Sequence, residues 1–158
     1  MIPMILNCVL FLALSVLPQV DWDFSAQTEI FTAKEIKKLE KERNVNDRIK
    51  IYTNASKTIQ KRLHKAVSRG QFQSVPGEMK LWTTLLSKSY EDIKANLNPE
   101  KKSKNLIKFE IQVRKSLADI RDYQLKAPVD QQDAFDACLT QGEAIRAKMV
   151  EMIFPERN

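Results

Sequence analysis

Histidine, glycine and cysteine are scarce in this chain, and their scarcity excludes several kinds of site. Among 158 residues there are one histidine, three glycines and two cysteines. A ferritin-like di-iron centre needs two Glu-x-x-His pairs, and covalent haem attachment needs Cys-x-x-Cys-His, so neither can be built here. A cysteine nucleophile needs a base beside its thiol, and His64, set between basic residues, is a weak candidate. We therefore expect no catalytic residues, no metal site and no cofactor.

Disulfide stabilisation is also excluded if the N-terminal segment is removed. Cys8 lies in that segment, which leaves Cys138 as the only other thiol. Cys138 falls on an apolar helical stripe and is expected to be a small buried hydrophobe. Stability must then come from packing.

Charged side chains are missing from the first 20 residues, MIPMILNCVLFLALSVLPQV, and appear only from Asp21 onward. The strongest apolar part, Ile5 to Leu17, has the size of a signal-peptide hydrophobic region. We interpret residues 1–26 as a signal peptide, with Ala26 as the candidate cleavage position. An uncleaved membrane anchor and an ordinary buried segment remain alternatives. The preferred interpretation predicts export, to the periplasm or the medium.

Helix-forming residues dominate the rest of the chain, and glycine and proline occur mostly between periodic segments. Residues 27–158 are expected to form one all-α domain. Three stripes of 3.6-residue period predict three of its helices. They are Met79, Trp82, Leu85, Leu86, Tyr90, Ile93 and Leu97; then Leu106, Phe109, Val113, Leu117 and Ile120, opened by Asn98 and Pro99; then Phe135, Cys138, Leu139, Gly142, Ile145, Met149 and Met152, opened near Asp130 and Asp133.

The remaining helix is predicted to begin at Ala33, after a capping box formed by Thr32 and Glu35. Its apolar residues continue until Gly70, which indicates a helix of roughly 35 residues that is longer than its neighbours. We favour a continuous helix that overhangs the domain. The alternative is a break at NVND, with Asn44 capping a second start.

Short connections between these helices favour an up-down-up-down four-helix bundle. Carboxylates are interleaved with Lys and Arg at helical spacing, as with Asp92 between Lys88 and Lys94. This pattern predicts modest ion pairs on a solvated surface rather than an acid–base pair.

The positive charge is concentrated in one part of the chain. Residues 27–74 contain 12 Lys/Arg and 5 Asp/Glu, a net charge of +7, whereas residues 75–158 contain 14 and 13, a net charge of +1. Five basic residues at the start of the first helix are the candidate site for an anionic partner: Lys34, Lys37, Lys38, Lys41 and Arg43. The alternative is a solvated helix face that binds no partner, because glutamates are interspersed among these basic residues.

Export and the lack of a recognition motif argue against nucleic acid. An anionic lipid, a cell-wall polymer or an acidic protein suits an exported chain better. A membrane would be contacted only through an uncleaved N-terminal segment or at its surface. We expect a binding or structural module of the cell envelope, the alternative being a small enzyme or ligand carrier with a site inside the bundle.

The run IKKLEKERNVNDRIKIY, preceded by a signal-like segment and followed by helices, resembles uncharacterised exported bacterial helical proteins. The resemblance covers about 30 residues. It implies export and helical structure, and it brings no activity and no functional residues.

Overall fold

The computed structural model describes residues 21–155, and every regular element in that range is helical. The all-α class is therefore confirmed for the described residues. The uncharged segment, residues 1–20, lies outside them, so the signal or anchor expected there stays a prediction. The helices are α1 (Phe24–Ile30), α2 (Ala33–Lys41), α3 (Val45–Ser68), α4 (Val75–Asn96), α5 (Lys104–Gln124) and α6 (Gln132–Ile153), with short 3₁₀ turns at Phe72–Ser74 and Val129–Gln131.

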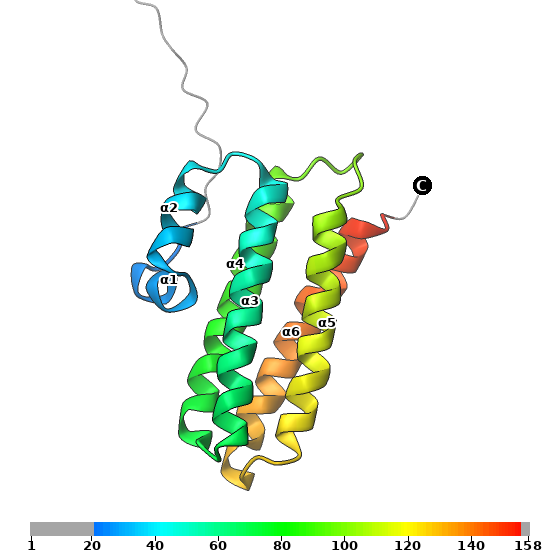
Figure 1. Ribbon diagram of the computed structural model, residues 1–158. Coiled ribbons are helices and arrows are strands. Elements are labelled where there is room, and N and C mark those ends of the chain that lie inside the picture. The colour runs from blue at the N-terminus through cyan, green and yellow to red at the C-terminus, as the bar shows by residue number, and fades with distance from the viewer. Residues whose placement is uncertain (1–20, 156–158) are drawn as a thin grey trace, which may run out of the picture.

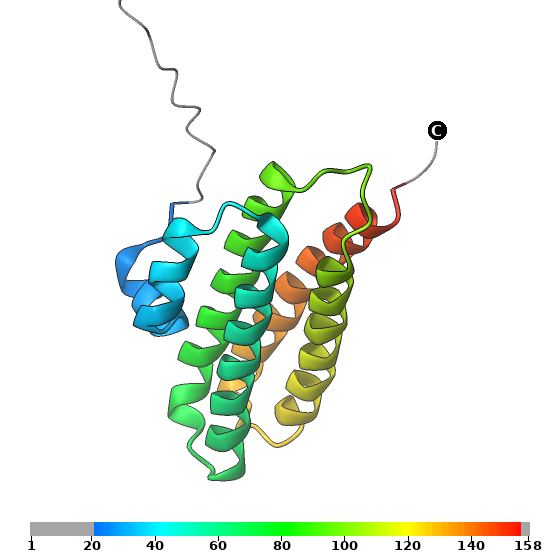
Figure 2. The same cartoon turned by 45° about the horizontal axis from the view of Figure 1, so that its top comes forward.

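Each of the four long helices packs against two others. α3 contacts α4 and α5, and α6 contacts the same two helices (Figures 1 and 2). The two short helices lie together on one side, where α1 packs on α4 and α2 lies beside α3. The long helices thus share one core, and the N-terminal pair covers part of its outside.

The core is made by the predicted apolar stripes. Its largest fully buried side chains include Trp82, Tyr52, Phe109 and Phe135. The indole Nε1 of Trp82 donates to Ser56 Oγ at 2.9 Å, so the polar atom of this buried ring is satisfied. Cys138 is buried as expected, and burial raises the pKa of its thiol to about 12.

Three long helices meet at Gly142 in α6. A Cβ atom at this position would lie 2.8 Å from Leu117 Cδ2 of α5 and 3.1 Å from Trp82 Cζ3 of α4. Both neighbours are buried, with exposed fractions of 1% and 0%. Glycine at this position therefore allows α6 to approach α4 and α5 closely.

The continuous first helix is wrong, because the chain breaks between α2 and α3. The carboxamide of Asn44 accepts from the Asn46 amide at 2.9 Å and caps the start of α3, while Glu42 Oε1 accepts from the Asn44 amide at 2.9 Å. Both Glu42 and Asn44 have extended ψ angles, 114° and 113°. Polar side chains that hydrogen-bond to their own backbone favour such a break over continued helix.

The start of α2 and the end of α3 lie where the sequence predicts them. Thr32 and Glu35 form the predicted capping box, with Glu35 Oε2 accepting from the Thr32 amide at 2.9 Å. Gly70 follows the end of α3 with a φ of +67°, which is a left-handed conformation that favours glycine. The Gln71 amide donates to the Ala66 carbonyl at 2.9 Å and closes the cap.

The predicted start of α5 at Asn98 and Pro99 is wrong. Asn98 instead accepts from the Glu100 amide in a local turn, and α5 begins at Lys104 with Ser103 as its N-cap. No apolar side chain between Pro99 and Leu106 anchors a helix, and packing supplies most helical stability. The other starts shift less: α4 already begins at Val75, and α6 at Gln132 without a side-chain cap.

Candidate functional site

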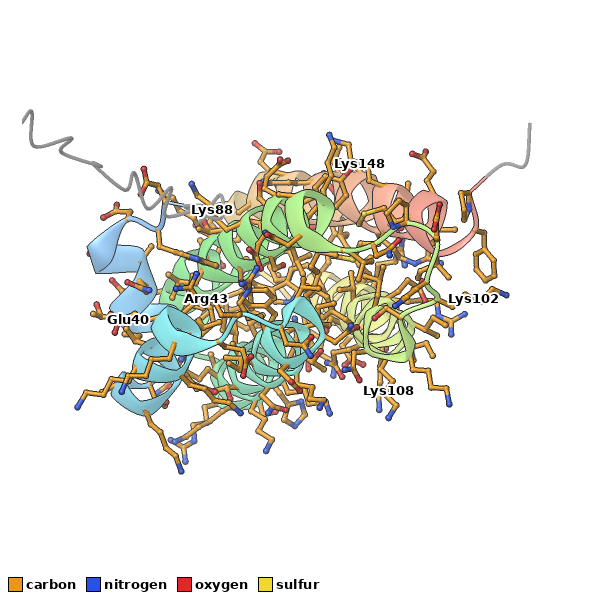
Figure 3. All side chains as sticks on the ribbon, turned by 90° about the horizontal axis from the view of Figure 1, so that it is seen from above. Glu40, Arg43, Lys88, Lys102, Lys108 and Lys148 are labelled. Atoms are coloured by element: carbon orange, nitrogen blue, oxygen red, sulfur yellow. The ribbon has the colours of Figure 1, made fainter. Side chains whose placement is uncertain are left out.

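Helix α2 gathers four of the five predicted basic residues on one side. Lys34, Lys37, Lys38 and Lys41 follow an i, i+3, i+4, i+7 spacing, which places them on the same helical face, and all four are exposed. We call these four residues the lysine face of α2. Within residues 21–155, no salt bridge involves any of them. In the view of Figure 3, nitrogen-tipped side chains crowd the lower edge of the molecule, beneath α2, α3 and α5.

The opposite side of α2 holds the helix against the protein. Ile36 and Leu39 are half-buried and pack against the core, and no residue of α2 is fully buried. Phe31, just before the helix, is buried and contacts Trp22 with a ring-centroid distance of 5.0 Å. The helix is thus anchored by its apolar side, and its lysine face remains exposed.

Two of the glutamates near the lysine face accept hydrogen bonds from backbone amides. The carboxylate of Glu35 is used in the capping box, and that of Glu42 accepts from the Asn44 amide. Glu40 is exposed and is labelled on the flank of α2 in Figure 3. The Asp47 carboxyl has a lowered pKa, caused mainly by its hydrogen bond from Lys50 and in small part by the charge of Lys38. These acids lower the net charge of the segment, because a hydrogen bond from a backbone amide leaves a carboxylate charged, but within residues 21–155 none of them forms a salt bridge with the four lysines.

Arg43, the fifth predicted residue, is separated from the other four by the end of the helix. It is exposed, but it lies in the connection between α2 and α3, where helical spacing no longer applies. The structure thus brings four of the five predicted residues together and leaves Arg43 beside them.

A buried ionic network holds this region to α4. Arg48 Nη2 and Nε contact the two Asp92 carboxylate oxygens at 2.6 and 2.9 Å, and Tyr52 Oη donates to Asp92 Oδ2 at 2.8 Å. Arg48 Nη1 also donates to the Glu42 carbonyl at 3.1 Å, which fixes the chain just after α2. Burial, assisted by the Asp92 charge, raises the pKa of Tyr52, so its hydroxyl stays protonated.

This network corrects the solvated pairing predicted for Asp92. The residue is 3% exposed and pairs with Arg48, 44 positions earlier. The acceptors and donors of the cluster satisfy one another, with Asn96 Nδ2 donating to Asp92 Oδ1 at 3.1 Å. The cluster therefore fixes the fold and is a poor candidate for a reactive site.

A second basic feature lies between α3 and α5, which run side by side in Figures 1 and 2. A shallow surface groove between them is lined by Lys57, Gln60, Lys61 and His64 of α3 and by Gln112, Lys115, Asp119 and Tyr123 of α5. We call it the α3–α5 groove. His64, the weak candidate base, is exposed here, with Nδ1 3.2 Å from Tyr123 Oη.

Gln60 is the unusual member of this groove. Its residue is 8% exposed, and neither polar atom of its side chain has a hydrogen-bond partner among the described residues. A buried amide left unpaired costs about 1–3 kcal/mol. Sequence patterning missed this residue, since a glutamine beside the apolar Ile59 carries no signal of burial.

Between residues 21 and 155, no group of three or more His, Cys, Asp or Glu side chains is arranged to hold a metal ion. In that same range, none of the helices combines the length and apolar character of a membrane span.

Comparison with known proteins assigns this chain to no family. No protein-family model, curated protein or solved structure matches this chain.

Proposed function

We propose that this protein is an exported module of the cell envelope that contacts an anionic component through the lysine face of α2. In this proposal the four long helices act as an up-down-up-down four-helix bundle that carries α2 on its side. The partner is an anionic lipid surface, a cell-wall polymer or an acidic protein. The resemblance and the uncharged N-terminal segment support export.

One observation carries the proposal: four exposed lysines share one helical face and have no ion-pair partner among the described residues. Like charges this close repel one another, so their grouping costs some stability in the free protein, and a bound anionic partner would offset that repulsion. The apolar side of α2 and the Arg48 contact to Glu42 hold the face in a fixed orientation. A fixed charged surface loses less entropy on binding than a mobile tail.

The test compares two triple variants that lose the same charge. Lys37, Lys38 and Lys41 are changed to Gln in the first, and Lys80, Lys94 and Lys126, which are exposed elsewhere, are changed to Gln in the second. Gln forms helices about as well as Lys, so both variants should fold. Binding to anionic lipid vesicles and to anionic cell-wall polymer is measured at low and high salt.

On vesicles, each basic residue near an anionic surface contributes about 1 kcal/mol. Loss of three lysines should weaken binding by about 100-fold at low salt. The control triple should bind much like the parent, and high salt should weaken binding of the parent because charges are screened. Equal loss in both triples would assign the attraction to net charge alone. If the parent binds neither vesicles nor polymer at low salt, an anionic lipid and a cell-wall polymer are both excluded as the partner.

A further inference from the structure

We propose that the α3–α5 groove is a second binding site, which takes a phosphate monoester group. The local charge suits this ligand. Lys57 and Lys61 of α3 and Lys115 of α5 line the groove together with one carboxylate, that of Asp119 in α5, an excess of two positive charges. A phosphate monoester carries close to two negative charges at neutral pH, which matches that excess. None of these three lysines takes part in a salt bridge among the described residues.

The Gln60 side chain provides a hydrogen-bonding group at the groove. Its amide has two N–H donors and one carbonyl acceptor, and all are unpartnered among the described residues although the residue is more than nine-tenths buried. Native proteins rarely leave a buried side-chain amide unsatisfied without a reason. Because Gln60 lines the groove together with the three lysines, a rotamer that turns its buried amide toward the groove would offer these N–H groups to a bound oxyanion.

Tyr123 supplies a further donor at one end of the groove. Burial raises the pKa of its hydroxyl, and the charges of Asp119 and Asp122 raise it further, so the group is protonated and able to donate. His64 Nδ1 lies 3.2 Å from this hydroxyl; in the tautomer that carries the proton on Nδ1, the imidazole donates to Tyr123 Oη and leaves the tyrosine O–H free for a ligand. Asp119 opposes anion binding locally, and the three lysines outweigh it. The groove thus combines positive charge with neutral donors, which is the chemistry that recognises phosphate.

The experiment uses two probes that share this group, soluble glycerol 3-phosphate and vesicles containing phosphatidic acid. Backbone amide shifts of the full chain are followed during titration with glycerol 3-phosphate at constant ionic strength, and vesicle binding is followed by sedimentation. Saturable shifts at residues 57–64 and 112–123 would support a free phosphate monoester as the ligand. Vesicle binding that is sensitive to groove variants, without such shifts, would support a lipid headgroup.

The Gln60→Leu variant separates binding from folding. It removes an unpaired buried amide, so its melting temperature should equal or exceed that of the parent, while affinity for the probe should fall at least 10-fold. A Lys57→Gln/Lys61→Gln variant should lose affinity similarly, and a Lys80→Gln/Lys94→Gln control should not. Unchanged affinity in both groove variants, or binding of neither probe, would overturn the site.

The proposal is independent of the lysine face of α2. The Lys37→Gln/Lys38→Gln/Lys41→Gln variant should bind glycerol 3-phosphate like the parent. If that variant instead lost all phosphate binding, the groove would be rejected as the phosphate site and the binding would belong to α2.

Discussion

Adding one methyl group at Gly142 tests the way α4, α5 and α6 meet. Alanine is favoured over glycine in a helix interior by about 1 kcal/mol, so a glycine-to-alanine substitution stabilises a helix where the added Cβ contacts nothing. Here the new Cβ would lie 2.8 Å from Leu117 Cδ2 and 3.1 Å from Trp82 Cζ3. Overpacking of this kind costs about 1–3 kcal/mol. The difference between these two figures is a net loss of up to about 2 kcal/mol, and we expect the upper part of that range because both neighbours are buried and cannot swing into solvent.

The matched control is Gly77→Ala in the first turn of α4. A Cβ at Gly77 meets no atom within 4 Å, so the same substitution should stabilise the protein by about 0.5–1 kcal/mol. Urea unfolding followed by circular dichroism gives the free energy of unfolding for the parent and both variants. A Gly142→Ala variant as stable as Gly77→Ala would refute the close approach of the three helices.

Three further variants or measurements examine other parts of the structure. Asp92→Ala leaves the Arg48 guanidinium buried and unpaired and should lower the free energy of unfolding in urea by about 3–5 kcal/mol. The control Asp122→Ala, at an exposed position, should change it by less than about 0.5 kcal/mol, and equal losses in the two variants would contradict the buried pair. Trp82→Ala should cost about 3–5 kcal/mol by loss of core volume, and a loss below about 1 kcal/mol would place this side chain outside the core. N-terminal sequencing of the mature protein tests the proposed export: because the Trp22 ring contacts Phe31 and Tyr52, we expect Trp22 to be retained and cleavage to lie upstream of the Ala26 position suggested by the sequence, and a mature chain that begins at Gln27 would contradict this.

Periodicity predicted the helices well because burial of one face determines helix position more strongly than any single residue does. The stripe from Met79 to Ile93 is buried throughout, and Phe135, Gly142 and Met149 mark the inward face of α6. The helix ends were predicted less well. Asn98 and Asn44 carry the same capping chemistry, yet only Asn44 begins a helix, since Val45 and Ile49 follow it into the core while three exposed residues follow Pro99.

The candidate site was predictable only in part. The lysine spacing on α2 is visible in the sequence, but the separation of Arg43 depends on the break after Lys41. Arg48 and Asp92 are 44 residues apart and look like ordinary surface charges, so only the packing of α3 on α4 brings them together. The buried Gln60 likewise has no signal in the sequence, because its burial comes from the packing of α3 against other helices.

Chemical footprinting of lysines directly tests whether the lysine face of α2 contacts an anionic partner, because the protein without substitutions reports on its own contact surface. The protein is acetylated under limiting conditions, free and bound to anionic vesicles or cell-wall polymer, and modification at each lysine is measured by mass spectrometry. Contact through α2 should slow acetylation of Lys34, Lys37, Lys38 and Lys41, while Lys80, Lys94 and Lys126 should react at unchanged rates. Unchanged acetylation of the four α2 lysines in a bound sample, with protection elsewhere, would contradict it.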